Sequence, residues 1–228
     1  MGLTGLQPGD DRYPAGLAAM LGGAAPRIAT LGDVGLLRQR KVALFSSVRC
    51  PGSLILKTYD LACSLRDAGA TVISGFHSPM EKECLTLLLR GRQPIIICPA
   101  RNIENMRLPR PWRQAMDEDR LLVLSSFPAG QNRATAERAH SRNLLVAALA
   151  DEVFVSHASP GGKMEQFCHQ VVSWRKPLLT FDAPENAGLV ALGAKPVRVQ
   201  EGLLKADSPR GTWEITDKGR DILQRGTN

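Results

Sequence analysis

Six short apolar segments alternate with helical stretches between Lys41 and Phe181, and this alternation restricts the possible folds more than any other feature. The apolar segments occupy residues 42–45, 70–74, 94–98, 121–125, 152–156 and 177–181. The intervening stretches carry apolar residues at helical spacing, as Leu54, Leu61 and Leu65 do after the first segment. This pattern predicts an α/β fold, in which helices cover both faces of a doubly wound, mainly parallel sheet.

The composition divides the chain into three parts. Residues 41–200 hold the alternating pattern and form the predicted main domain. Residues 1–40 are rich in Gly, Pro and Ala, and short helical stretches such as residues 31–37 predict a small helical lead-in that packs as a lid or collar. Residues 201–228 are polar and form a short C-terminal extension, with a helix expected over residues 215–223.

The sequence is basic, with a formal net charge of +7. Such a charge favours polyanionic partners, above all nucleic acid or nucleotides, although solubility alone would also explain it. Five cysteines without a C-x-x-C pair suit a reducing compartment. No apolar stretch reaches membrane-spanning length and the N-terminus lacks a signal-peptide pattern, so we expect a cytoplasmic protein without a membrane partner.

Motifs for catalysis and cofactor binding are missing from the sequence. It has no Ser-His-Asp triad, nucleophile elbow or metal-ligand cluster. It also lacks the G-x-G-x-x-G fingerprint of dinucleotide sites and the P-loop motif. We therefore expect no catalytic residue, no metal and no cofactor.

Sites in parallel α/β sheets lie beyond the carboxyl ends of the strands, so the loops after the apolar segments hold the candidates. After the first two segments these are Ser46, Ser47, Arg49, Ser74, Gly75, His77 and Glu81. Hydroxyl groups and a guanidinium suit a phosphate, and glycine permits close approach of a ligand. The alternatives are an ordinary turn after the first strand, a helix cap for Glu81 in place of a sugar contact, and an incidental role for His77.

A helix end, a buried strand and a glycine turn follow one another over residues 142–163. The candidates in this stretch are Arg142, Asn143, Gly161, Gly162 and Lys163. The glycines can present bare amides at a helix N-terminus, where the helix dipole favours an anion, and Lys163 adds a positive charge. The alternatives are a surface ion pair between Arg142 and Glu137, and a tight turn that needs glycine but not lysine.

A basic segment, residues 101–113, contains several arginines and Trp112. These side chains could follow a nucleic-acid backbone beside an aromatic platform. A solvated helix face is an equally good interpretation of the same residues.

These motifs together resemble the DprA/Smf family of DNA-processing proteins, within the SLOG group of Rossmann-like domains. The resemblance runs from Tyr13-Pro14 to about Pro196. The first strand resembles the family's strand that ends in Gly-Ser-Arg, and the loop from Ser74 to Glu81 resembles its Ser-Gly-x-Ala-x-Gly-Ile-Asp loop. Residues 125–130 resemble its Ser-Glu-x-Pro-x-Gly segment. The pair Arg142-Asn143 matches the core of its Arg-Asn-Arg motif.

The resemblance implies a Rossmann-like domain that binds single-stranded DNA through a basic pocket. Proteins of that family protect incoming strands in DNA uptake, transformation and recombination, and help to load a recombinase. Single-stranded DNA and a recombinase are therefore the implied partners. Because many Rossmann-like binders pair through helices, a homodimer is a further expectation.

A second resemblance gives an alternative function. Pro160-Gly161-Gly162 followed by Glu165 is similar to part of the Pro-Gly-Gly-x-Gly-Thr-x-x-Glu motif of the LOG nucleoside 5′-monophosphate phosphoribohydrolases. That resemblance implies a nucleotide N-glycosidase, in which Arg142 positions the phosphate and Glu165 serves the sugar, where a carboxylate can stabilise oxocarbenium-like charge. A SLOG-type sensor that binds a nucleotide without chemistry is the third possibility.

Overall fold

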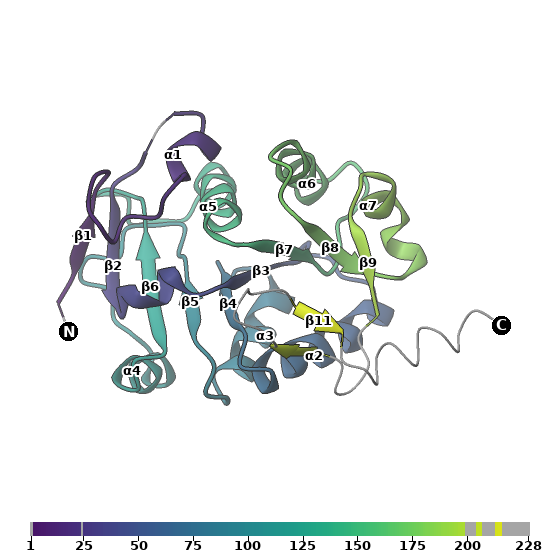
Figure 1. Ribbon diagram of the computed structural model, residues 1–228, viewed down its shortest axis with the longest axis horizontal. Coiled ribbons are helices and arrows are strands. Elements are labelled where there is room, and N and C mark those ends of the chain that lie inside the picture. The colour runs from purple at the N-terminus through teal and green to yellow at the C-terminus, as the bar shows by residue number, and fades with distance from the viewer. Residues whose placement is uncertain (1, 24, 199–203, 207–212, 216–228) are drawn as a thin grey trace.

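The computed structural model describes residues 2–23, 25–198, 204–206 and 213–215, and its main element is a nine-stranded sheet (Figure 1). The strands in chain order are β1 (Thr4–Leu6), β2 (Ile28–Gly32), β3 (Lys41–Phe45), β4 (Thr71–Ser74), β5 (Ile95–Ile97), β6 (Leu121–Ser125), β7 (Glu152–Val155), β8 (Leu178–Phe181) and β9 (Lys195–Val197). In space they follow the order β1-β2-β6-β5-β4-β3-β7-β8-β9. All neighbours from β6 to β9 are parallel, which confirms the predicted α/β class.

Helices cover both faces of the sheet. The helices are α1 (Leu17–Met20), α2 (Gly52–Asp67), α3 (Pro79–Leu88), α4 (Arg110–Asp117), α5 (Ala136–Leu149), α6 (Lys163–Ser173) and α7 (Ala187–Ala191), with 3-10 turns η1 (Val34–Arg38) and η2 (Pro184–Asn186). Figure 1 shows α1, α5, α6 and α7 on one side of the sheet and α2, α3 and α4 on the other.

The alternating side chains of β3 divide the core between the two faces. Ala43 and Phe45 join the cluster under α5 and α6, whereas Val42 and Leu44 join the cluster under α2 and α3. Successive side chains of a strand point to opposite faces, so a strand buried on both faces must be apolar throughout. This requirement explains the continuous apolar run that the sequence shows at this strand.

The strand order reverses between β3 and β7, where β3 pairs in parallel with β4 on one side and β7 on the other. The loops that leave β3 and β7 therefore diverge to opposite sides, and such a switch point leaves a crevice at the carboxyl end of the sheet. Two backbone hydrogen bonds fix this edge: the Ser156 amide donates to the Phe45 carbonyl, and the Ser47 amide donates to the His157 carbonyl, both at 2.9 Å.

The N-terminal segment differs from its prediction. The expected helical lead-in contributes two strands: β1 pairs antiparallel with β2, and β2 pairs antiparallel with β6. Leu6 and Ile28 are each about 1% exposed and belong to the main core, and only the short α1 and η1 are helical. The sequence does not reveal these strands because both are short, with Gly5 inside β1 and Gly32 at the end of β2, so neither shows a clear period of two.

Little of the C-terminal extension is described. Strands β10 (Leu204–Ala206) and β11 (Trp213–Ile215) form an antiparallel pair. The helix expected over residues 215–223 lies outside the described residues, apart from Ile215, which ends β11. Among the described helices, none combines the length and the apolar character that a membrane span requires.

Candidate functional site

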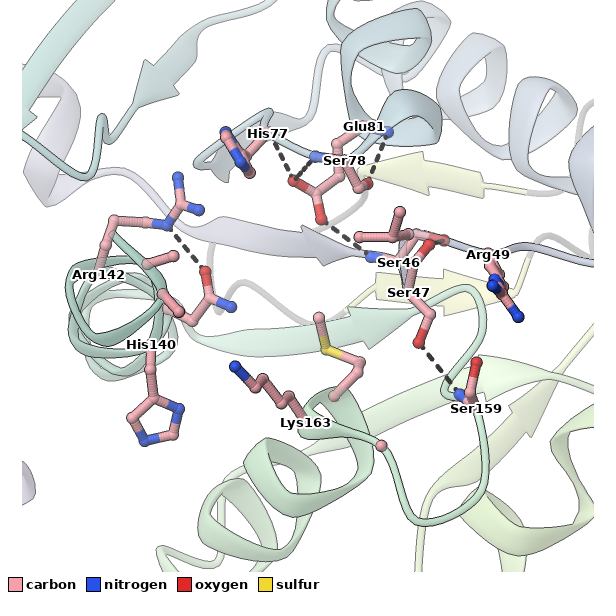
Figure 2. Close-up of a pocket in the computed structure, with 16 residues that line it drawn as sticks. Ser46, Ser47, Arg49, His77, Ser78, Glu81, His140, Arg142, Ser159 and Lys163 are labelled. Carbon is pink, nitrogen blue, oxygen red and sulfur yellow. Dashed lines mark hydrogen bonds between the residues drawn. The ribbon is translucent and has the colours of Figure 1, made fainter. Parts of the chain in front are cut away.

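A cavity of about 450 Å³ opens at the carboxyl end of the sheet beside the β3/β7 switch point. It lies between the loops after β3 and β7 and the N-terminal turns of α3, α5 and α6 (Figure 2). The predicted residues that line it are Ser46, Ser47, Arg49, His77, Glu81, Arg142, Asn143, Gly162 and Lys163. Ser74, Gly75 and Gly161 lie outside this lining. The tertiary fold thus gathers candidates from the segments that follow β3, β4 and β7 and from helix α5.

Arg142 is the most constrained cation of the cavity, with only 3% of its surface exposed. Its Nη1 donates to the Cys98 carbonyl at 2.9 Å, and its Nε donates to Asn143 Oδ1 at 2.8 Å. Burial lowers the pKa of this guanidinium, and the charge of Glu81 acts in the opposite direction. Within the described residues it has no ion pair, so the predicted alternative of a surface pair with Glu137 is wrong.

Gly75 makes room for this guanidinium. A β-carbon at position 75 would lie 1.3 Å from Nη1 of Arg142, which is far inside van der Waals contact. The preceding Ser74 is fully buried, and its Oγ accepts a hydrogen bond from the Phe76 amide at 3.2 Å. Gly75 therefore positions the arginine by leaving room for it, and neither Ser74 nor Gly75 lines the cavity.

The Glu81 carboxylate connects the loop after β3 to the loop after β4 by hydrogen bonds. Its Oε1 accepts from the Ser46 amide at 3.1 Å, and its Oε2 accepts from the amides of His77 and Ser78 at 2.8 and 3.3 Å. The Ser78 side chain in turn accepts from the Glu81 amide at 3.3 Å, which completes a capping box at the start of α3. The predicted cap is confirmed, and the carboxylate is occupied by three backbone donors.

The loop after β3 is tied to the loop after β7. The Ser47 hydroxyl accepts from the Ser159 amide at 3.1 Å, and both residues line the cavity. Behind them His157 is buried, with its Nδ1 3.1 Å from Asn186 Oδ1. Because the Asn186 Nδ2 donates to the Ser156 carbonyl, its Oδ1 is the acceptor and the His157 Nδ1–H donates to it.

The diglycine turn works differently from the prediction that its amides are bare. The Gly161 amide donates to Glu165 Oε2 at 2.7 Å, and the Gly162 amide donates to the Ser159 carbonyl at 2.9 Å. The turn itself requires glycine: Gly161 has φ +67°, and a β-carbon at Gly162 would lie 2.8 Å from the Ser159 oxygen. The amides without an acceptor in the described chain belong instead to the next residues, Lys163 to Glu165 in the first turn of α6.

Positive charge dominates the cavity. Lys163 lines it from α6, and Figure 2 shows Arg49 on the side opposite Arg142. Among the described lining residues Glu81 is the sole carboxylate, and its oxygens are already hydrogen-bonded. Helix α6 begins at this wall, where its dipole adds a partial positive charge. The arrangement suits an anion that brings its own acceptor oxygens. No group of three or more potential metal ligands occurs among the described residues.

The sequence matches the family described as DNA recombination-mediator protein A over residues 5–165. The chain belongs to this family. Two solved family structures share its fold. DNA processing protein A from Streptococcus pneumoniae has a TM-score of 0.71 and 19% identity, over 86% of this chain and 71% of that chain. DNA processing protein A from Helicobacter pylori, studied for its single-stranded DNA binding mode, has a TM-score of 0.68 and 18% identity, over 99% and 97%.

A comparison with curated protein sequences gives no match. The family match of this DNA-processing protein begins in β1 and ends in the first turn of α6. It therefore includes every loop and helix N-terminus that lines the cavity.

Sequence reasoning found Arg142 and Asn143 on one wall of the cavity in this family member but missed their neighbours Ala136, Ala139 and His140. Helix α5 presents Ala136, Ala139, His140 and Asn143, which recur at the i, i+3, i+4 and i+7 positions of a single helix face. That spacing was visible in the sequence. The sequence did not show which face of α5 packs against the core. The buried apolar residues of this helix all follow Arg142, so its N-terminal half carries no apolar stripe that would mark the buried face. Ser78, also missed, could have been found from the capping-box pattern it forms with Glu81.

Proposed function

We propose that this chain binds single-stranded DNA along the phosphate backbone, in the cavity beside the β3/β7 switch point, and acts without catalysis. The observation that carries the proposal is the buried Arg142 guanidinium, which faces the cavity without an ion pair in the described chain. A buried charge without an ion pair is costly, and an incoming phosphate supplies that ion pair. Family membership supports DNA as the source of the phosphate.

The rest of the lining supports a strand over a free ion. Lys163 and the amides that begin α6 provide a second phosphate position across the cavity from Arg142. Val48 is 72% exposed and Met164 is half-buried, so sugars and bases meet apolar atoms at the rim. None of the described lining residues is Phe, Tyr or Trp. We therefore expect phosphate contacts to dominate the affinity, with little preference among bases.

The geometry gives less support to the alternative of a nucleotide N-glycosidase. Such a reaction needs a carboxylate free to stabilise positive charge at the sugar or to activate water. Glu81 accepts three backbone hydrogen bonds, and Glu165 is engaged by the Gly161 amide and does not line the cavity. Neither carboxylate is placed for that chemistry, and so we propose a binding protein.

Fluorescence polarisation with a labelled oligo(dT) strand, titrated with salt, tests the proposal. The logarithm of the binding constant should fall linearly with the logarithm of salt concentration, with a slope of about −0.7 for each neutralised phosphate. Arg142→Gln should weaken binding strongly, whereas Arg90→Gln, an exposed arginine before β5, should not. Binding that is absent or independent of salt contradicts the proposal.

A parallel incubation with AMP separates the remaining alternatives. Release of free adenine would show an N-glycosidase. Tight binding of AMP without release, together with weak binding of oligo(dT), would show a nucleotide sensor. The proposal expects no base release and weak AMP binding, because one phosphate fills only part of the cavity.

We also propose that the protein acts in DNA uptake, transformation or recombination, in the cytoplasm, with a recombinase as protein partner and as a homodimer. The description of the family as recombination mediators supports the recombinase. Sedimentation of the purified chain tests the dimer. Strand-exchange assays, in which the chain should raise recombinase loading on coated single strands, test the partner.

A further inference from the structure

A second cavity, of about 530 Å³, lies between the loops that follow β5 and β6. Because β5 and β6 are parallel to β3 and β4, these loops emerge at the same carboxyl edge of the sheet as the first cavity. The side chains that give it its chemistry are Arg101, Glu104, Asn105, Arg107 and Asn132. The basic segment of residues 101–113 thus splits: two of its arginines line this cavity, and Arg110 and Arg113 lie on α4.

Hydrogen bonds hold the two loops in one fixed arrangement. The Asn102 side chain, in a residue only 6% exposed, donates to the Phe127 carbonyl at 3.2 Å and accepts from the Glu104 amide at 2.7 Å. The Asn102 amide donates to the Gln131 carbonyl at 2.8 Å, and the Ser125 hydroxyl donates to the Arg101 carbonyl at 2.7 Å. The cavity is therefore built into the fold.

The exposed groups of this cavity match the chemistry of a nucleotide chain. Arg101 and Arg107 are exposed and have no ion pair within the described residues, and Glu104 is the single carboxylate in the lining. Guanidinium groups bind phosphate oxygens. The carboxamides of Asn105 and Asn132 offer both donors and acceptors, which is what the edges of unpaired bases require. Met106 has the one apolar side chain among the lining residues, so the cavity is a poor site for the apolar face of a peptide.

Two covalent connections limit the distance between the cavities. Cys98, whose carbonyl accepts a hydrogen bond from Arg142, lies three residues before Arg101. The α-carbons of residues 98 and 101 are therefore at most about 11 Å apart. Asn132 lines the second cavity and Ala136 lines the first, so their α-carbons are at most about 14 Å apart. A strand that leaves the first cavity toward β6 reaches the second within a few nucleotides.

We infer that this second cavity takes further nucleotides of the same single strand, with Arg101 and Arg107 on its phosphates and Asn105 and Asn132 beside its bases. The inference rests on the proposed function of the first cavity. It predicts that affinity grows with strand length until both cavities are filled.

The test compares the double variant Arg101→Gln/Arg107→Gln with the wild type on a short and a long oligo(dT) strand. The control is Arg90→Gln/Arg92→Gln, which removes the same charge from two exposed arginines that precede β5 and so lie at the opposite edge of the sheet. On a strand of about 16 nucleotides the salt slope of the cavity variant should become shallower by about 1.4, because two phosphate contacts are lost. On a strand of about 4 nucleotides its affinity should equal that of the wild type.

The possible results separate this inference from the function on which it rests. If the cavity variant and the control lose affinity equally on the long strand, or if the cavity variant loses as much on the short strand, the second cavity is not a subsite. If the wild type binds neither strand, the proposed function fails as well. Thermal unfolding of both variants checks that the loops remain folded.

Discussion

The guanidinium of Arg142, on helix α5, lies directly against the α-carbon of Gly75, in the loop after β4. A β-carbon at position 75 would fall 1.3 Å from Nη1 and 1.8 Å from Cζ of that arginine. The cation is therefore held from three sides, by this glycine, by the Cys98 carbonyl and by Asn143. A preorganised cation loses little conformational entropy when a phosphate binds.

Gly75→Ala should displace the Arg142 side chain and weaken single-stranded DNA binding about as much as Arg142→Gln. Inserting a methyl group into a packed site should also lower the free energy of unfolding by about 1–3 kcal/mol. Polarisation measures the first effect and urea unfolding measures the second. The matched control is Gly52→Ala at the start of α2, where a new β-carbon meets nothing within 4 Å. Unchanged DNA affinity in a folded Gly75→Ala protein would contradict the role we give to this contact.

Glu81→Gln should destabilise the protein without weakening DNA binding. The amide that replaces the carboxylate keeps one acceptor oxygen, so it can no longer accept all three hydrogen bonds from Ser46, His77 and Ser78. We expect a loss of about 1–3 kcal/mol in the free energy of unfolding, because buried amides lose their acceptor. Glu83→Gln, at an exposed position of the same helix, is the control. A large loss of DNA affinity with unchanged stability would show that Glu81 contacts the ligand.

Lys163→Gln should reduce the salt dependence of binding. The side chain is exposed at the start of α6 and lines the cavity, so it contributes one phosphate contact. The slope of log binding constant against log salt should become shallower by about 0.7. The control, Lys195→Gln, removes an exposed lysine at the amino end of β9, whereas the cavity lies at the carboxyl ends of the strands. Equal slopes for the two variants would exclude Lys163 from the binding site.

Lys176 should make the stability depend on pH in the alkaline range. Burial lowers its pKa from 10.5 to about 8, with Asp151 acting in the opposite direction and Lys41 in the same direction as burial. Its Nζ donates to the Ala148 carbonyl at 2.9 Å and also to the Ala150 carbonyl. Between about pH 8 and 10.5 the unfolded chain binds more protons at this position than the folded chain, so this residue makes stability rise with pH.

The comparison with Lys176→Met isolates that contribution, because titrating thiols and other groups remain in both proteins. The stability of the wild type relative to the variant should increase from below pH 8 to about pH 10 and then level off. Urea unfolding across this range measures it. Two stability curves that stay parallel over the window would show that Lys176 titrates normally.

The N-terminal strands show where pattern recognition fails. Each of the strands β3 to β8 contains at least two consecutive apolar residues, because helices cover both of its faces, and this pattern is readable locally. Strands β1 and β2 lie at the edge of the sheet, and only Leu6, Ile28 and Thr30 are fully buried there. Three buried positions in two short strands are too few to reveal a period, so their pairing with β6 became visible only in the folded chain.

The amino-acid sequence by itself determined the α/β class, the order of its central strands and helices, and the loops from which the cavity is built, because burial periodicity and strand-end loops are local properties. Only the tertiary structure decided what those loops do. It packed Gly75 against the guanidinium of Arg142 and hydrogen-bonded the Glu81 carboxylate to three backbone amides. It also provided acceptors for the diglycine amides, namely the Glu165 carboxylate and the Ser159 carbonyl. Which donors remain free for a ligand depends on hydrogen bonds between segments that are distant in the chain, and the spacing of residues along the sequence carries no record of them.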